Sequence, residues 1–88
     1  MSAQIVNYLF EKYGNFSSES TSGEMEISVD VPGPFGQLQI SFPLKENMTL
    51  DDVKNEIHQS YILTLDNNID YLNKKIEIIR KFKENLTQ

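Results

Sequence analysis

The chain has 88 residues and a mass of 10.2 kDa, so it forms a single small domain (residues 1–88) whose core alone gives modest stability. It contains no cysteine and one histidine, His58, which excludes disulfides, thiol catalysis and a multi-histidine metal site within one chain. The net charge of −5 disfavours direct binding to nucleic acid or to anionic membranes, and oligomerisation is the remaining way to add stability.

No stretch of the sequence reaches the roughly 20 apolar residues that a membrane-spanning helix needs. The N-terminus also lacks the basic start and apolar centre of a signal peptide. We therefore expect a cytoplasmic protein without a membrane partner, located either in a bacterium or in the cytosol of an infected host.

Residues 2–13 are predicted to form a short amphipathic helix. Ser2 can cap its start, apolar residues recur at helical spacing along one face, and Gly14 stands where a helix commonly ends. The next segment, residues 15–23, is polar and has no periodicity, so we expect a flexible loop there.

Residues 25–31 and 37–44 alternate between apolar and polar side chains, which predicts two strands of a β-hairpin over residues 25–44. Five turn-forming residues, 32–36, connect them. An isolated hairpin is marginal in water, so its apolar face should pack on a helix. Phe35 at the tip either folds back onto its own sheet or offers an apolar anchor to a partner. The apolar face consists of Met25, Ile27, Val29, Val31, Leu38, Ile40, Phe42 and Leu44.

Residues 49–86 are predicted to form one long helix. Ten steps between apolar residues cover the 36 positions from 50 to 86, a mean spacing of 3.6, without a glycine or proline. The alternative is a helical hairpin broken near residues 66–68, because asparagine is a weak helix former. The predicted fold class is therefore α+β, with the long helix in a helical bundle formed by oligomerisation.

The segment from Met25 to Ile57 resembles the opening of a ubiquitin-like β-grasp domain. A strand, a turn and a second strand lead into Met48-Thr49-Leu50-Asp51-Asp52-Val53-Lys54-Asn55-Glu56-Ile57, which is similar to the helix start of that fold. The resemblance implies further strands after the helix, whereas the remaining residues of this chain are predicted to be helical.

The long helix carries two apolar rows, which is more than the rest of the chain can cover. We expect a dimer first and a tetramer next, in a compact bundle rather than a long supercoil, because the mean spacing is 3.6 rather than 3.5. Antiparallel pairing would set Asp66 and Asp70 beside basic residues. The expected oligomer interface is Ile69, Leu72, Ile76 and Ile79. The expected contacts with another, unidentified protein are Phe35, Tyr71, Ile78 and Phe82.

The sequence offers no catalytic, cofactor-binding or metal-binding residues. His58 has no acidic residue three or four positions away to orient it, so we expect no enzyme. Size and richness in Asn, Ile and Lys are similar to those of small acidic oligomeric proteins of phages and low-GC bacteria. The expected function is a protein–protein interaction module: an adaptor, an inhibitor or a chaperone, of phage type and directed at a host or defence protein.

A second function class stays open. An oligomer could bind a small anionic ligand, such as a nucleotide, in pockets between its subunits. Phosphate contacts would then come from the basic end of the long helix. These candidate residues are Lys74, Lys75, Arg80, Lys81 and Lys83.

Overall fold

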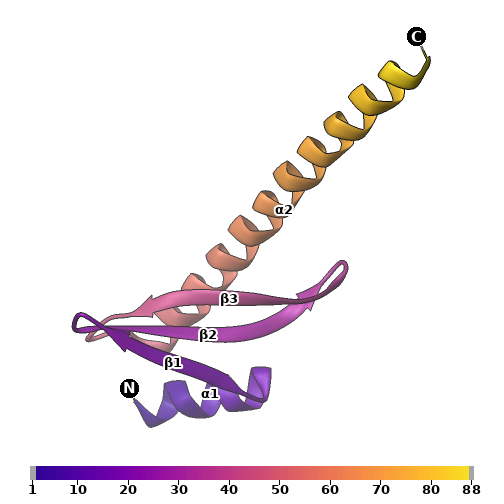
Figure 1. The fold of residues 1–88 in the computed structure, drawn as a ribbon. Coiled ribbons are helices and arrows are strands. Elements are labelled where there is room, and N and C mark those ends of the chain that lie inside the picture. Colours follow the sequence, from indigo (N-terminus) through magenta and orange to yellow (C-terminus); the bar gives the residue numbers. More distant parts are fainter. Residues whose placement is uncertain (1, 88) are drawn as a thin grey trace.

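The computed structural model describes residues 2–87 and shows an α+β fold, as predicted. The elements are α1 (Ala3–Tyr13), β1 (Phe16–Thr21), β2 (Glu24–Gly33), β3 (Gly36–Leu44) and α2 (Leu50–Thr87). The three strands form one antiparallel sheet in the order β1-β2-β3, and α2 continues far beyond it (Figure 1). The result is an elongated molecule measuring 63 × 28 × 18 Å.

Helix α1 forms at the predicted position and uses the predicted caps. The Ser2 hydroxyl accepts a hydrogen bond from the N–H of Ile5 (3.3 Å). At the other end Gly14 adopts a φ of +76°, and its N–H donates to the Phe10 carbonyl (2.9 Å). These bonds satisfy backbone groups at both helix ends. Ile5 and Leu9, four residues apart on one face of the helix, are buried against the sheet.

The prediction of a flexible loop at residues 15–23 is wrong, since most of this segment is strand β1. Phe16 pairs with Val29 of β2, and the pairing continues to a two-residue turn at Ser22 and Gly23. Both turn residues have positive φ values (53° and 81°), which is typical of the tight turns that join antiparallel strands. Except for Phe16, which is half-buried, the strand exposes all its side chains. Because both faces of this strand are exposed, its sequence shows no alternation between apolar and polar residues, and the strand could not be recognised from that pattern.

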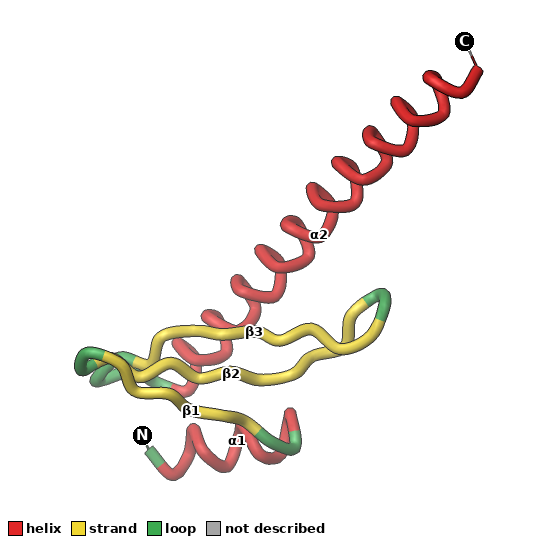
Figure 2. Tube along the Cα trace, viewed as in Figure 1, coloured by secondary structure: helices red, strands yellow, loops and turns green. Residues whose placement is uncertain are grey.

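Strands β2 and β3 form the predicted hairpin with a shorter turn. Their pairing extends to Gly33 and Gly36, so the turn is Pro34 and Phe35 (Figure 2) rather than the five residues 32–36. A Cβ atom on Gly33 would lie 2.6 Å from the carbonyl oxygen of Gly36, so the close approach of the two strands requires glycine. Pro43 lies on β3, an edge strand, where its missing N–H is tolerated.

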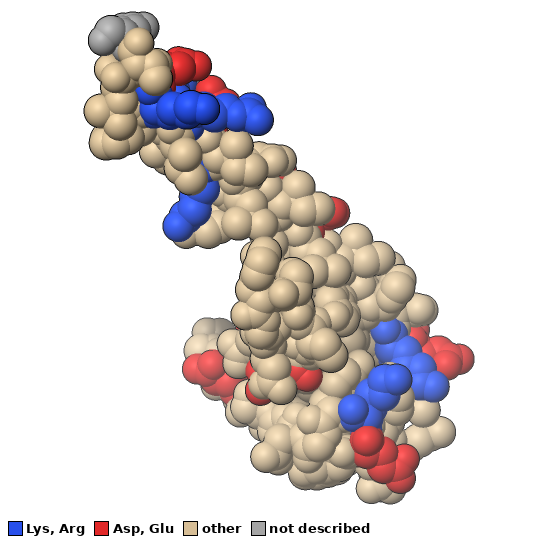
Figure 3. Space-filling model, turned by 90° about the vertical axis from the view of Figure 1, so that its right-hand side faces the viewer, with Lys and Arg blue, Asp and Glu red and all other residues tan. Residues whose placement is uncertain are grey.

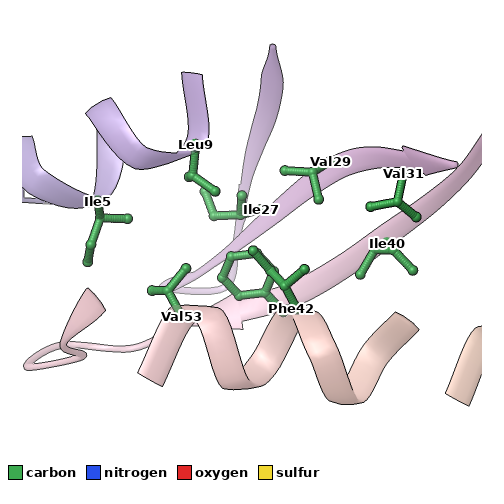
Figure 4. Packing of buried hydrophobic residues seen from close by; sticks show 9 residues of the cluster. Ile5, Leu9, Ile27, Val29, Val31, Ile40, Phe42 and Val53 are labelled. Carbon is green, nitrogen blue, oxygen red and sulfur yellow. The ribbon is translucent and has the colours of Figure 1, made fainter. Parts of the chain in front are cut away.

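The apolar face of the hairpin packs on helix, as predicted, and both helices contribute to covering it (Figure 4). The opposite face is polar, and there the Ser28 and Ser41 hydroxyls are hydrogen-bonded across β2 and β3 (2.8 Å). The fold therefore has two layers with one core between them. Its buried members are Ile5, Leu9, Ile27, Val29, Val31, Ile40, Phe42, Val53 and Ile57. Met25, Leu38 and Leu44 pack against this core half-buried.

Helix α2 is one continuous helix, so the alternative of a break near residues 66–68 is wrong. Its start is fixed by a reciprocal capping pair: the Thr49 N–H donates to Asp52 Oδ2 (2.9 Å), and the Asp52 N–H donates to Thr49 Oγ1 (3.1 Å). Further along, the Tyr61 hydroxyl donates to the carbonyl oxygen of Pro32 and ties α2 to β2. Within residues 2–87 no strand follows α2, so the β-grasp resemblance does not extend past this helix.

Candidate interaction surface

Helix α2 consists of a part that packs on the sheet and a part that does not. Val53 and Ile57 are buried beneath the sheet, and Tyr61, Thr64 and Asn68 are half-buried. From residue 69 to residue 87 every side chain is exposed. We call residues 69–87 the projecting segment, which leads away from the sheet in Figure 1.

The four residues expected at an oligomer interface share one side of the projecting segment. We call Ile69, Leu72, Ile76 and Ile79 the first row. Their exposed fractions lie between 38% and 65%, so each presents a large apolar surface to solvent. Half-buried Leu65 precedes the row along the same side, and exposed Leu86 extends it toward the C-terminus. The structure thus places these residues together on an open surface.

The residues expected to contact a second protein form a second row: Tyr71, Ile78 and Phe82. Their exposed fractions are 56% to 67%. Phe82 follows Thr64 by 18 residues, which is five full helical turns, so both lie on the same side of α2. Since Thr64 belongs to the half-buried residues near the sheet, the second row continues the sheet-facing side of the helix into solvent.

Phe35 is exposed at the hairpin tip, with 83% of its surface accessible, so it does not fold back onto the sheet. Between this tip and α2 lies a mainly apolar groove of about 240 Å³. Tyr71 of the second row and Leu72 of the first row both border it. The sequence did not indicate this groove. Its lining residues are Pro34, Phe35, Gly36, Gln37, Leu38, Asn68, Tyr71 and Leu72.

The five basic residues proposed as anion contacts all lie in the projecting segment and are exposed (Figure 3). Successive residues of a helix are rotated by about 100°, so these side chains are spread around its circumference. Lys75 Nζ lies 4.8 Å from the centre of the Tyr71 ring, a cation–π contact. The arrangement does not make the five cations converge on one ligand within a single chain.

A second cavity, of about 590 Å³, lies between α1, the end of β2 and α2. Lys54 Nζ is 5.1 Å from the centre of the Tyr8 ring, and the Tyr8 and Tyr13 rings meet edge to face at 6.2 Å. Partial burial and the adjacent Tyr8 phenol raise the pKa of Tyr13 to about 12. Sequence reasoning missed this cavity because its residues come from three separate elements. They include Tyr8, Lys12, Tyr13, Lys54, His58 and Tyr61.

Within residues 2–87 no three His, Asp or Glu side chains are grouped closely enough to hold a metal ion. In the same range no helix is both long enough and apolar enough to cross a membrane. The single histidine, His58, is exposed at the rim of the second cavity. Comparison with protein-family models, curated proteins and solved structures found no match for this chain.

Proposed function

We propose that this protein is a non-enzymatic protein–protein interaction module that binds through its projecting segment. One observation carries the proposal. Two rows of large apolar side chains are exposed on the projecting segment, which does not pack on the sheet. Such a molecule would act as an adaptor, an inhibitor or a chaperone, in the cytosol of a bacterium or of an infected host.

The energetics of an unsupported helix favour a bound partner. Most helical stability in proteins comes from the packing of an apolar face, and the projecting segment has no such packing within the described residues 2–87. Complete burial of a leucine, isoleucine or phenylalanine side chain contributes about 1.5–3 kcal/mol. A partner that covers even part of the two rows would therefore stabilise both the complex and the helix.

A small anionic ligand is the second candidate, and the cavity between α1 and α2 supports it. Lys12 and Lys54 could meet negative charge there, although Asp30 also lines the cavity, and the tyrosine rings could stack on a planar group. This site differs from the pockets between subunits that the sequence suggested. Native mass spectrometry of the gently purified protein would find a bound small molecule if this candidate is right, and would find only the protein mass if it is wrong.

The interaction function can be tested with two matched double variants. Ile76→Asp with Ile79→Asp places two charges in the first row. Asn55→Asp with Gln59→Asp adds the same charge at two exposed positions of α2 that precede the projecting segment, and serves as the control. An N-terminally tagged chain is produced in its native host, together with an untagged copy, and bound proteins are identified by mass spectrometry.

We expect the wild-type and control chains to retain a bound protein, either the untagged copy or another protein, and the first-row variant to lose it. Circular dichroism should show that all three chains are folded, with both helix and strand signals present. Equal recovery with the wild-type chain and the first-row variant, or no bound protein with any chain, would contradict the proposal.

A further inference from the structure

From Ile62 to Leu86, α2 follows a seven-residue repeat. The repeat is not apparent when the apolar spacing is averaged over the whole helix. Residues 50–61 lie in the part of α2 that packs on the sheet, and the apolar series counted from Leu50 to Leu86 through Phe82 has a mean spacing of 3.6. From Ile62 to Leu86 the steps along one side are three and four in alternation, the 3.5 spacing of a two-stranded coiled coil. In heptad letters, position a is Ile62, Ile69, Ile76 and Lys83. Position d is Leu65, Leu72, Ile79 and Leu86.

The charges beside this seam distinguish the two possible orientations. A parallel pair would stack Lys83 on Lys83 of the second copy in the core and place Lys75 beside Arg80. An antiparallel pair with Leu72 opposite Ile76 of the second copy instead places Asp66 beside Arg80, twice by symmetry. Lys83 then faces Leu65 of the second copy, next to Asp66. Among the charged residues beside the seam, only Lys75 meets its own counterpart, at the two-fold axis. Charge complementarity therefore favours the antiparallel pair.

The same antiparallel alignment brings Phe82 of the second row to the hairpin groove. The two-fold axis is perpendicular to the helices, so their sheet-facing sides lie on the same side of the dimer. Phe82 of each copy then lies beside Asn68 of the other copy, at the edge of the groove that Phe35, Leu38 and Leu72 border. The groove of about 240 Å³ is mainly apolar and open, and so suits an aromatic ring.

We infer, building on the interaction function proposed above, that the partner of the projecting segment is a second copy of this chain. The two α2 helices pair antiparallel over residues 62–86, and Phe82 of each copy occupies the hairpin groove of the other. This dimer covers the first row, Phe82 and Phe35 together. A parallel pair leaves Phe35 in solvent and gives Phe82 no groove to enter.

The absence of cysteine makes the orientation measurable, because a single introduced cysteine takes one spin label per chain. At Lys74→Cys, close to the two-fold axis, the labels of a dimer stay close in either orientation and report pairing itself. At Asn85→Cys the orientations differ. Residue 85 lies opposite residue 63 of the second copy in the antiparallel dimer, so the labels are separated by roughly 33 Å along the helix axis. A parallel pair would hold the two backbones about 10 Å apart.

Sedimentation equilibrium at tens of micromolar should give twice the chain mass of 10.2 kDa, with the long separation at residue 85 and the short one at residue 74. Phe82→Ala should weaken the dimer at least about tenfold, as loss of an interface anchor does. Phe10→Ala, an equally drastic truncation of a half-exposed ring on α1, should leave it unchanged.

A monomeric wild-type chain, or a short separation at residue 85, would overturn this inference. So would equal effects of the two phenylalanine variants. A monomer that still recovers another protein through the first row would overturn the dimer and leave the proposed interaction function in place. A monomer that recovers no protein would overturn both.

Discussion

Tyr13 is a residue whose environment predicts a measurable response to pH. Its pKa rises from the ordinary value of 10 to about 12, because partial burial and the adjacent Tyr8 disfavour the phenolate. Below pH 10 the phenol is neutral in both the folded and the unfolded chain. Between pH 10 and 12 the unfolded chain releases the proton and the folded chain keeps it, so the free energy of unfolding falls as pH rises.

We expect Tyr13→Phe to lose part of this alkaline destabilisation. Urea unfolding followed by circular dichroism between pH 9 and about 12 measures it. Tyr71→Phe removes a hydroxyl from the exposed second row and should retain the wild-type slope. If both variants show the wild-type slope, the Tyr13 phenol does not titrate as described.

At the scale of the element, the start of α2 depends on two side-chain bonds. Thr49→Ala removes the hydroxyl that accepts from the Asp52 N–H, and should cost about 1 kcal/mol of unfolding free energy. The matched control is Thr87→Ala at the other end of the helix, where the hydroxyl only donates to the Glu84 carbonyl on an exposed turn. In urea titrations, Thr49→Ala should therefore unfold at a lower midpoint concentration than Thr87→Ala. Equal midpoints would contradict the capping role of Thr49.

The elements that could be predicted are those whose side chains alternate between core and solvent. In β2 and β3 the apolar face repeats every second residue, and in α2 apolar residues repeat at helical spacing, so both patterns survive in the sequence. Strand β1 could not be predicted, because its serines face solvent on both sides and its stability comes from backbone pairing with β2.

The candidate site was predictable in part for the same reason. Periodicity identified both rows of α2, including Ile76 and Phe82. The groove depends instead on the angle at which the hairpin tip approaches α2, and that angle is set by the core and by the bond from Tyr61 to Pro32. No local pattern in the sequence encodes such an approach.

At the scale of the whole molecule, the proposed dimer should respond to a reversal of charge. Asp66→Arg would replace two attractive contacts with Arg80 by two repulsive ones, and should raise the dissociation constant by about threefold to tenfold at low salt. Arg80→Asp introduced together with Asp66→Arg should restore the wild-type affinity. Fluorescence-detected sedimentation of the wild type and of both variants measures this.

High salt should reduce the difference between Asp66→Arg and the wild type, since exposed charges are screened. If the double variant binds no better than Asp66→Arg alone, the two side chains are not neighbours in the dimer.

The projecting segment also decides how the molecule moves through solution. The radius of gyration is 18.1 Å, against about 12 Å for a compact chain of this length. Friction on such a rod-and-head shape slows diffusion, so a single chain would leave a gel-filtration column ahead of a round protein of 10.2 kDa. By elution volume alone, a monomer would therefore be mistaken for a dimer. Sedimentation equilibrium depends on mass and not on shape, so it would give the true number of chains.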